Sequence, residues 1–191
     1  MIVSKHCSFE LPGWVDLFLE SWLMPLATTS QRMQLAIALS EENVRQQTGG
    51  PFAAVVVNEG TRELRLVGIN LVTSAGLSIA HAEMVALSLA QTAVGEWNLS
   101  HAGRLQLVTS CEPCAMCFGA VPWSGVKSLI CGARKKDAEE AARPKVPELH
   151  EGLSQCLETG HKSFAAFAVE KADTGITKLH ACSQCGLMFW E

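Results

Sequence analysis

The chain lacks an apolar stretch long enough to cross a membrane. Its richest apolar segment, Trp14 to Leu26, contains the acids Asp16 and Glu20, whereas a helical span needs about 20 consecutive apolar residues. A secretory leader is not indicated either, because acidic residues and Pro12 interrupt the first apolar run and no small-residue cleavage site follows it. These absences disfavour a membrane protein, and we expect a soluble protein of the cytoplasm.

An excess of positive charge is also missing. The 191 residues carry a formal net charge of −4. A protein that holds a phosphate backbone presents clustered Lys and Arg instead. The composition therefore disfavours a nucleic-acid partner and favours a small, nearly neutral substrate.

Internal repeats, low-complexity tracts and long polar linkers are absent as well. The length is typical of one compact domain with a substantial core. We therefore expect a single domain over residues 1–191. It comprises a helical N-terminal segment (1–48), a motif-bearing core (49–134) and a divergent C-terminal part (143–191).

The apolar pattern of the chain predicts an α/β protein. Thr28, Thr29 and Ser30 offer N-caps for a helix that runs towards Gly49. The elements expected next are hairpin strands (52–58 and 63–70), a helix (82–94), and strands (104–109 and 126–131) on either side of a second short helix. The middle of the chain thus runs β-β-α-β-α-β. Two more helices are expected over 135–142 and 148–158.

Eight cysteines are present, and without an export signal they indicate reduced thiols or metal ligands. Two of them belong to Pro113-Cys114-Ala115-Met116-Cys117, which opens a predicted helix, as does His81-Ala82-Glu83. Positions i and i+3 share a helix face, so Cys114 and Cys117 can bind one ion together with a nitrogen of His81. Three protein ligands leave a fourth position open. The spacing therefore predicts a catalytic zinc site.

Glu83 is the predicted proton-transfer residue of this site. Two thiolates cancel the charge of Zn²⁺, so water activated at the ion needs a nearby base. Two residues after His81, the Glu83 carboxylate can lie beside the ion without binding it and can carry the proton to a ring nitrogen. The combination H-x-E with P-C-x-x-C is the signature of zinc nucleobase deaminases.

A structural zinc site is the alternative interpretation of the cysteine pair. In it, Cys182 and Cys185 complete a four-cysteine knot with Cys114 and Cys117. The wide separation disfavours this, because such pairs usually lie roughly 15–20 residues apart. A knot would also give Glu83 no task.

The C-terminal part contains a candidate for a second metal site. His180 with Cys182 and Cys185 has a ligand spacing that can hold another ion, although buried free cysteines are common. Cys111, just before Pro113, is expected to pack and not to bind metal.

The sequence resembles the cytidine deaminase-like superfamily and, within it, the guanine deaminase branch. The segments that carry the resemblance are Gly50-Pro51-Phe52-Ala53-Ala54-Val55-Val56-Val57, Asn70, His81-Ala82-Glu83-Met84, Thr109-Ser110-Cys111-Glu112-Pro113-Cys114-Ala115-Met116-Cys117-Phe118-Gly119-Ala120 and Trp123. The match is dense from about Gly49 to Arg134. It implies a three-layer α/β/α cytidine deaminase-like fold with a central mixed sheet of about five strands, a Zn²⁺ cofactor and a homodimer.

The resemblance also implies substrate contacts. Phe52 stacks on the base, Asn70 bonds its edge, and the backbone of Ala82 adds a polar contact. The alternatives are that Phe52 belongs to the core and that Asn70 ends a strand. The related enzymes end in an aromatic residue that closes a neighbouring subunit's pocket, a role that falls on Trp190 here. Packing of this tail on its own domain is the other interpretation.

One departure from the branch concerns substrate recognition. Guanine deaminases usually carry Phe-Asp-Glu or Phe-Asp-Asp soon after the third strand, where an acid meets the amidine edge of guanine. This chain has Ala142-Arg143-Pro144-Lys145-Val146-Pro147 there. Glu148 or Glu151 can return a carboxylate to that place, unless both are solvated helix residues. We expect hydrolysis of guanine to xanthine and ammonia.

Other functions fit parts of the sequence. A tRNA adenosine deaminase has similar motifs, including Gly132-Ala133-Arg134, but the mixed charges of the C-terminal half disfavour a tRNA groove. A nucleoside, cytosine or aminotriazine deaminase would use the same zinc chemistry. A non-catalytic zinc-binding dimerisation module is the alternative outside enzymes, and the presence of Glu83 disfavours it.

Overall fold

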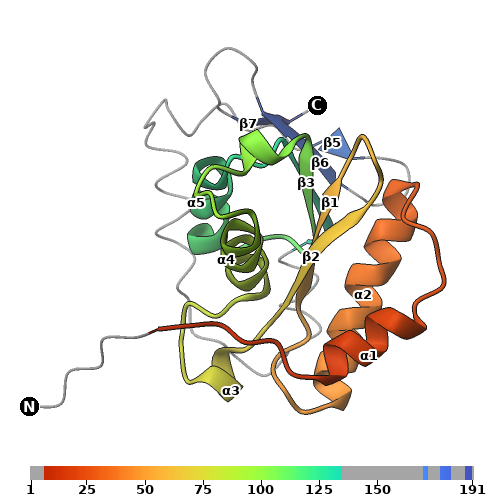
Figure 1. Ribbon diagram of the computed structural model, residues 1–191, viewed down its shortest axis with the longest axis vertical. Coiled ribbons are helices and arrows are strands. Elements are labelled where there is room, and N and C mark those ends of the chain that lie inside the picture. The colour runs from red at the N-terminus through yellow and green to blue at the C-terminus, as the bar shows by residue number, and fades with distance from the viewer. Residues whose placement is uncertain (1–6, 135–169, 172–176, 182–187, 191) are drawn as a thin grey trace, which may run out of the picture.

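The computed structural model describes residues 7–134, 170–171, 177–181 and 188–190 (Figure 1). The helices are α1 (Trp14–Ser21), α2 (Thr29–Arg45), α3 (Val72–Ala75), α4 (Ala82–Val94), the 3-10 helix η1 (Leu99–Ala102) and α5 (Ala115–Ser124). The strands are β1 (Ala53–Asn58), β2 (Leu64–Ile69), β3 (Leu105–Cys111), β4 (Ser128–Ala133), β5 (Glu170–Lys171), β6 (Thr177–Ala181) and β7 (Met188–Trp190). None of the described helices combines the length and apolarity that a bilayer span requires.

The described strands form one mixed sheet. Its order is β2-β1-β3-β4-β6-β5, and β7 also pairs with β6. β3 and β4 are parallel, and the other pairs are antiparallel. β5 has only 2 residues and β7 only 3, so the longer strands are the five that the predicted fold requires.

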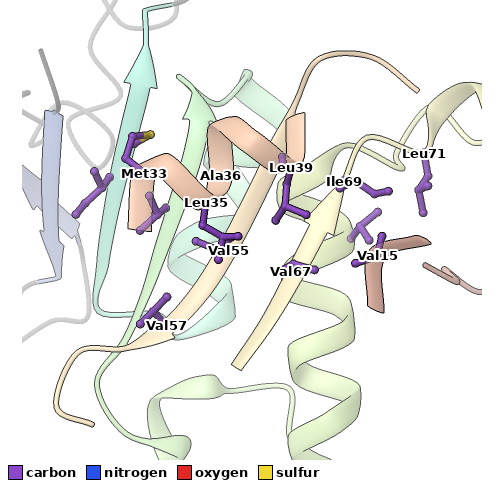
Figure 2. Close-up of a cluster of buried hydrophobic side chains, with 14 of the residues drawn as sticks. Val15, Met33, Leu35, Ala36, Leu39, Val55, Val57, Val67, Ile69 and Leu71 are labelled. Atoms are coloured by element: carbon purple, nitrogen blue, oxygen red, sulfur yellow. The ribbon is translucent and has the colours of Figure 1, made fainter. Parts of the chain in front are cut away.

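Helices cover both faces of the sheet. α1 and α2 lie on one face, and α4 and α5 lie on the other (Figure 1). Because side chains alternate along a strand, Val55 and Val57 of β1 pack with Leu35 and Leu39 of α2 (Figure 2). Val56 joins the cluster on the α4 side. The fold is therefore the predicted three-layer α/β/α arrangement.

The local signals for the motif-bearing elements are confirmed. Thr28 forms a capping box with Gln31: the Gln31 N–H donates to Thr28 Oγ1, and the Thr28 N–H donates to Gln31 Oε1. The predicted hairpin is β1 and β2, paired antiparallel. α4 has the predicted bounds of 82–94. α3 and η1 were not predicted, because 4 residues are too few to show a helical period. The helices expected over 135–142 and 148–158 lie outside the described residues.

Gly68 in β2 allows α4 to approach the sheet closely. A Cβ atom at Gly68 would lie 2.2 Å from the Ala82 carbonyl oxygen and 2.4 Å from the Ala86 nitrogen. These are backbone atoms of the first turns of α4, so a side chain here displaces the helix that begins next to His81. The absence of a side chain at Gly68 therefore helps to place the predicted zinc site.

We expect Gly68→Ala to lower the free energy of unfolding by about 1–3 kcal/mol, because the methyl group overpacks a backbone contact. Gly119→Ala is the matched control. A Cβ there meets nothing within 4 Å, and alanine in a helix is more stable than glycine by roughly 0.5–1 kcal/mol. Urea unfolding of both variants measures the difference. Equal stability of the two variants would contradict the close approach.

Candidate zinc site

The structure brings His81, Cys114 and Cys117 together at the starts of two neighbouring helices. His81 is the N-cap of α4, Cys114 is the N-cap of α5, and Cys117 lies in the first turn of α5. His81 Nδ1 lies 3.5 Å from Cys114 Sγ, and the two sulfurs lie 3.6 Å apart. All three ligand atoms lie within 4.8 Å of one another. The predicted ligand set is therefore one compact cluster.

This donor set fits zinc. Tetrahedral zinc, with zinc–sulfur bonds of roughly 2.3 Å, separates two sulfur ligands by roughly 3.8 Å, which is close to the spacing found here. One nitrogen and two sulfurs are typical zinc donors. Within the described ranges, the cluster contains these three ligands and no fourth. Cys182 and Cys185, the candidates for a four-cysteine knot or a second metal site, lie outside the described residues.

The hydrogen bond between the two cysteines shifts their pKa values in opposite directions. The hydrogen bond with Cys117 lowers the pKa of Cys114 to about 5, and backbone N–H groups of Cys117 and Met116 and the nearby His81 act in the same direction. The pKa of Cys117 is raised, first by its hydrogen bond with Cys114 and then by burial. One thiolate and one thiol thus share a proton, which a metal ion displaces when it binds both sulfurs.

Glu83 lies beside this cluster but is not part of it. It is the second residue of α4 and is only 8% exposed. Burial raises the pKa of its carboxyl, and the negative charge of Cys114 adds to the effect. A buried carboxyl with a raised pKa, close to the metal ligands, has the properties of a proton-transfer group.

The structure also brings Phe52 and Asn70 together. Phe52 directly precedes β1 and Asn70 directly follows β2, and the Asn70 N–H donates to the Phe52 carbonyl oxygen at 3.0 Å. The Leu71 N–H donates to the Ala80 carbonyl oxygen at 2.9 Å. Asn70 is thereby connected to the segment that leads directly into His81.

The other predicted residues fall in different places. Cys111 is half-buried at the end of β3 and is not one of the three clustered ligands. The backbone of Trp190 pairs with Leu179 of β6 in the same chain, and its side chain lies outside what the structure describes. Glu148 and Glu151 lie outside the described residues too.

Sequence reasoning missed Asn43. This residue is fully buried in α2, and its side-chain amide bonds the backbone of Gly50 and of Asn70. A signal was present, because asparagine is unfavourable in a helix interior and is retained there when its side chain has another partner. The partners themselves lie too far away in sequence for a local pattern to reveal them.

Known proteins share these features. The sequence profile of the cytidine and deoxycytidylate deaminase zinc-binding region matches residues 27–133. Guanine deaminase of Bacillus subtilis (strain 168) is 38% identical over 109 residues, which cover 57% of this chain and 67% of that protein. The tRNA-specific adenosine deaminase of the same strain is 36% identical over 106 residues, which cover 55% and 63% of the two chains.

A solved structure of guanine deaminase from Nitrosomonas europaea is similar over more of the chain. The identity is 37% and the TM-score is 0.66, with 81% of this chain and 87% of that chain covered. The profile match contains the clustered ligands and Glu83. The chain therefore belongs to the cytidine and deoxycytidylate deaminase zinc-binding family.

Proposed function

We propose that this zinc-dependent hydrolytic deaminase converts guanine to xanthine and ammonia. We infer the reaction type from the cluster of His81, Cys114 and Cys117, which lies beside the buried carboxyl of Glu83. Guanine is favoured as the substrate because the guanine deaminases described above share 37–38% sequence identity with this chain over the matched residues.

The chain's own residues supply the proton transfers of this reaction. When bound, zinc provides the Lewis acidity that makes water a nucleophile near neutral pH. Glu83 takes a proton from the attacking water and passes it to the ring nitrogen beside the carbon that carries the amino group. Glu83 then takes the remaining proton of the added hydroxyl group and delivers it to the amine, which leaves as ammonia as the carbon–nitrogen bond breaks. Its raised pKa suits a group that must hold a proton between these steps.

Phe52, Asn70 and Ala82 form the proposed base-binding surface. Asn70 Oδ1 already faces the backbone N–H groups of Gly50 and Val72, at 3.4 and 3.3 Å. Its amide NH₂ has no hydrogen-bond partner among the described residues, so it can donate to an acceptor on the edge of the base. The Ala82 N–H lies in the first turn of α4, where N–H groups have no partner within the helix.

The remaining parts of the proposal rest on residues beyond the described ones. We propose that Glu148 or Glu151 supplies the carboxylate that meets the amidine edge of guanine. We also propose a homodimer in which Trp190 covers the partner's site. We further propose that the protein acts in purine metabolism in the cytoplasm.

The substrate assignment predicts one result in a panel of amino-substituted rings. Purified, zinc-loaded protein should release ammonia from guanine, and ultraviolet spectra should show xanthine forming. The other compounds are guanosine, cytosine, cytidine, adenine, ammeline and an anticodon stem-loop. Of Glu148→Gln and Glu151→Gln, one variant should lose activity on guanine, and the other serves as its control.

Each alternative has its own outcome in that panel. The similarity to tRNA-specific adenosine deaminase favours the stem-loop as the second candidate substrate, whereas the net charge of −4 weighs against it. If guanine is inert and the stem-loop or another ring is deaminated, the guanine assignment is wrong and the zinc deaminase assignment stands. Failure of every compound would contradict both.

A further inference from the structure

Asn43 connects helix α2 to both segments of the proposed base-binding surface. It is 0% exposed, and its Nδ2 donates to the Gly50 carbonyl oxygen at 2.8 Å and to the Asn70 carbonyl oxygen at 3.0 Å. We propose that Asn43 is a positioning residue, which acts through the main chain of Asn70 and through the turn at Gly50 to place the Asn70 side chain for substrate. This inference rests on the proposed role of Asn70 in binding the base.

The hydrogen bonds around Asn43 link the two segments to each other as well. The Asn70 N–H donates to the Phe52 carbonyl oxygen at 3.0 Å, and Asn70 Oδ1 lies 3.4 Å from the Gly50 nitrogen that it accepts from. Asn43 thus fixes the main chain of Asn70, while Gly50 holds one end of its side-chain amide. The orientation of the free NH₂ of Asn70 depends on both.

The amide NH₂ of Asn43 matches the two acceptors at this position. Two carbonyl oxygens converge on one side chain, so its contacting group must donate two hydrogen bonds, as an NH₂ group does. A carboxylate of the same shape would place an acceptor against two acceptors. Asn43 Oδ1, by contrast, is buried without a hydrogen-bond partner among the described residues. Leaving an acceptor unpaired costs stability, which argues that Asn43 serves more than packing.

The turn that Asn43 holds is shaped for this contact. A Cβ at Gly49 would lie 1.9 Å from the Asn70 carbonyl oxygen, so glycine permits the approach of the two segments. The Thr48 N–H donates to the Asn43 carbonyl oxygen at 3.1 Å. From α1, Trp14 Nε1 donates to Thr48 Oγ1 at 3.0 Å. The turn is therefore anchored on two helices.

A double-mutant cycle tests whether Asn43 acts through Asn70. We expect Asn43→Leu to lower kcat/KM for guanine by roughly ten-fold, mainly through a higher KM, because the surface that binds the base is displaced. In an Asn70→Ala background, the same change should alter kcat/KM by less than about three-fold, since the side chain being positioned is gone. Losses that multiply in the double variant would overturn the proposal.

Gln106→Leu is the control for a general loss of stability. Gln106 is another buried amide, near the start of β3 and away from the motifs. It accepts from Arg32 at 2.7 Å and donates to Glu59 at 2.8 Å and to Ser128 at 3.0 Å. This variant should lose stability in urea as Asn43→Leu does, but with KM unchanged. A raised KM in both variants would show that lowered stability explains the effect of Asn43.

A spectroscopic measurement separates this inference from the substrate assignment. In ¹⁵N-labelled protein without substrate, the side-chain NH₂ resonances of Asn70 should shift in Asn43→Leu and stay in place in Gln106→Leu. Asn43→Ala removes the donor without adding bulk, and alanine favours the helix, so it provides a second variant if Asn43→Leu does not fold. Unchanged Asn70 resonances in a folded Asn43 variant would contradict the proposal. Shifted resonances in a protein inert towards guanine would instead contradict only the proposed substrate.

Discussion

Glu83→Gln should lower the rate of deamination by roughly 10²–10⁴-fold and leave the zinc content unchanged. The amide keeps the size and shape of the side chain but cannot take a proton from water or deliver one to the ring. Glu83 is not one of the clustered ligands His81, Cys114 and Cys117, so the metal site should stay intact. Steady-state kinetics and metal analysis of the same preparation give both quantities.

Glu96→Gln is the control for this loss of a negative charge. Glu96 follows the C-terminal end of α4, at the opposite end of the helix from Glu83, and forms an exposed contact with His101 at 4.0 Å. It should retain wild-type turnover. Wild-type turnover by Glu83→Gln itself would refute the proton-transfer role. Loss of zinc from that variant would show instead that Glu83 supports the metal site.

The sequence predicted the elements and the ligands whose signals are local. The bounds of α4 follow from its helical period, and the N-cap positions of His81 and Cys114 follow from the motifs that open the two helices. Three residues of spacing place Cys114 and Cys117 in the same turn. Two of the strand pairs also follow simple rules, because a hairpin joins β1 to β2 and a crossover through α5 joins the parallel strands β3 and β4.

Local sequence patterns did not reveal the contacts between residues that lie far apart in the chain. Asn43 and Asn70 are 27 residues apart, and nothing in either local pattern indicates that one bonds the other. Gly68 likewise appears as an ordinary glycine in a strand until α4 is placed against it. Substrate choice is the hardest part, since the carboxylate proposed to meet the amidine edge of guanine lies beyond the residues that the structure describes. The reaction type could therefore be predicted from few residues, and the substrate only from similarity.

Loss of zinc is expected to abolish turnover, with a larger effect than any substitution in the base-binding surface. The purified protein should hold about one zinc per chain, because three clustered ligands form one catalytic-type site. Dialysis against a chelator should remove both zinc and activity, and added zinc should restore them. Cys117→Ser should fail to retain zinc, since a hydroxyl replaces a thiolate that binds the ion.

Cys131→Ala is the matched control for Cys117→Ser. Cys131 is also buried, but it lies in β4 and is not one of the three clustered ligands. Its removal should leave zinc content and turnover unchanged. Two firmly bound zinc ions per chain would indicate a second site that includes Cys182 and Cys185. A protein purified without chelators that holds no zinc, yet deaminates guanine, would refute the assignment of His81, Cys114 and Cys117 as the ligands of a catalytic metal.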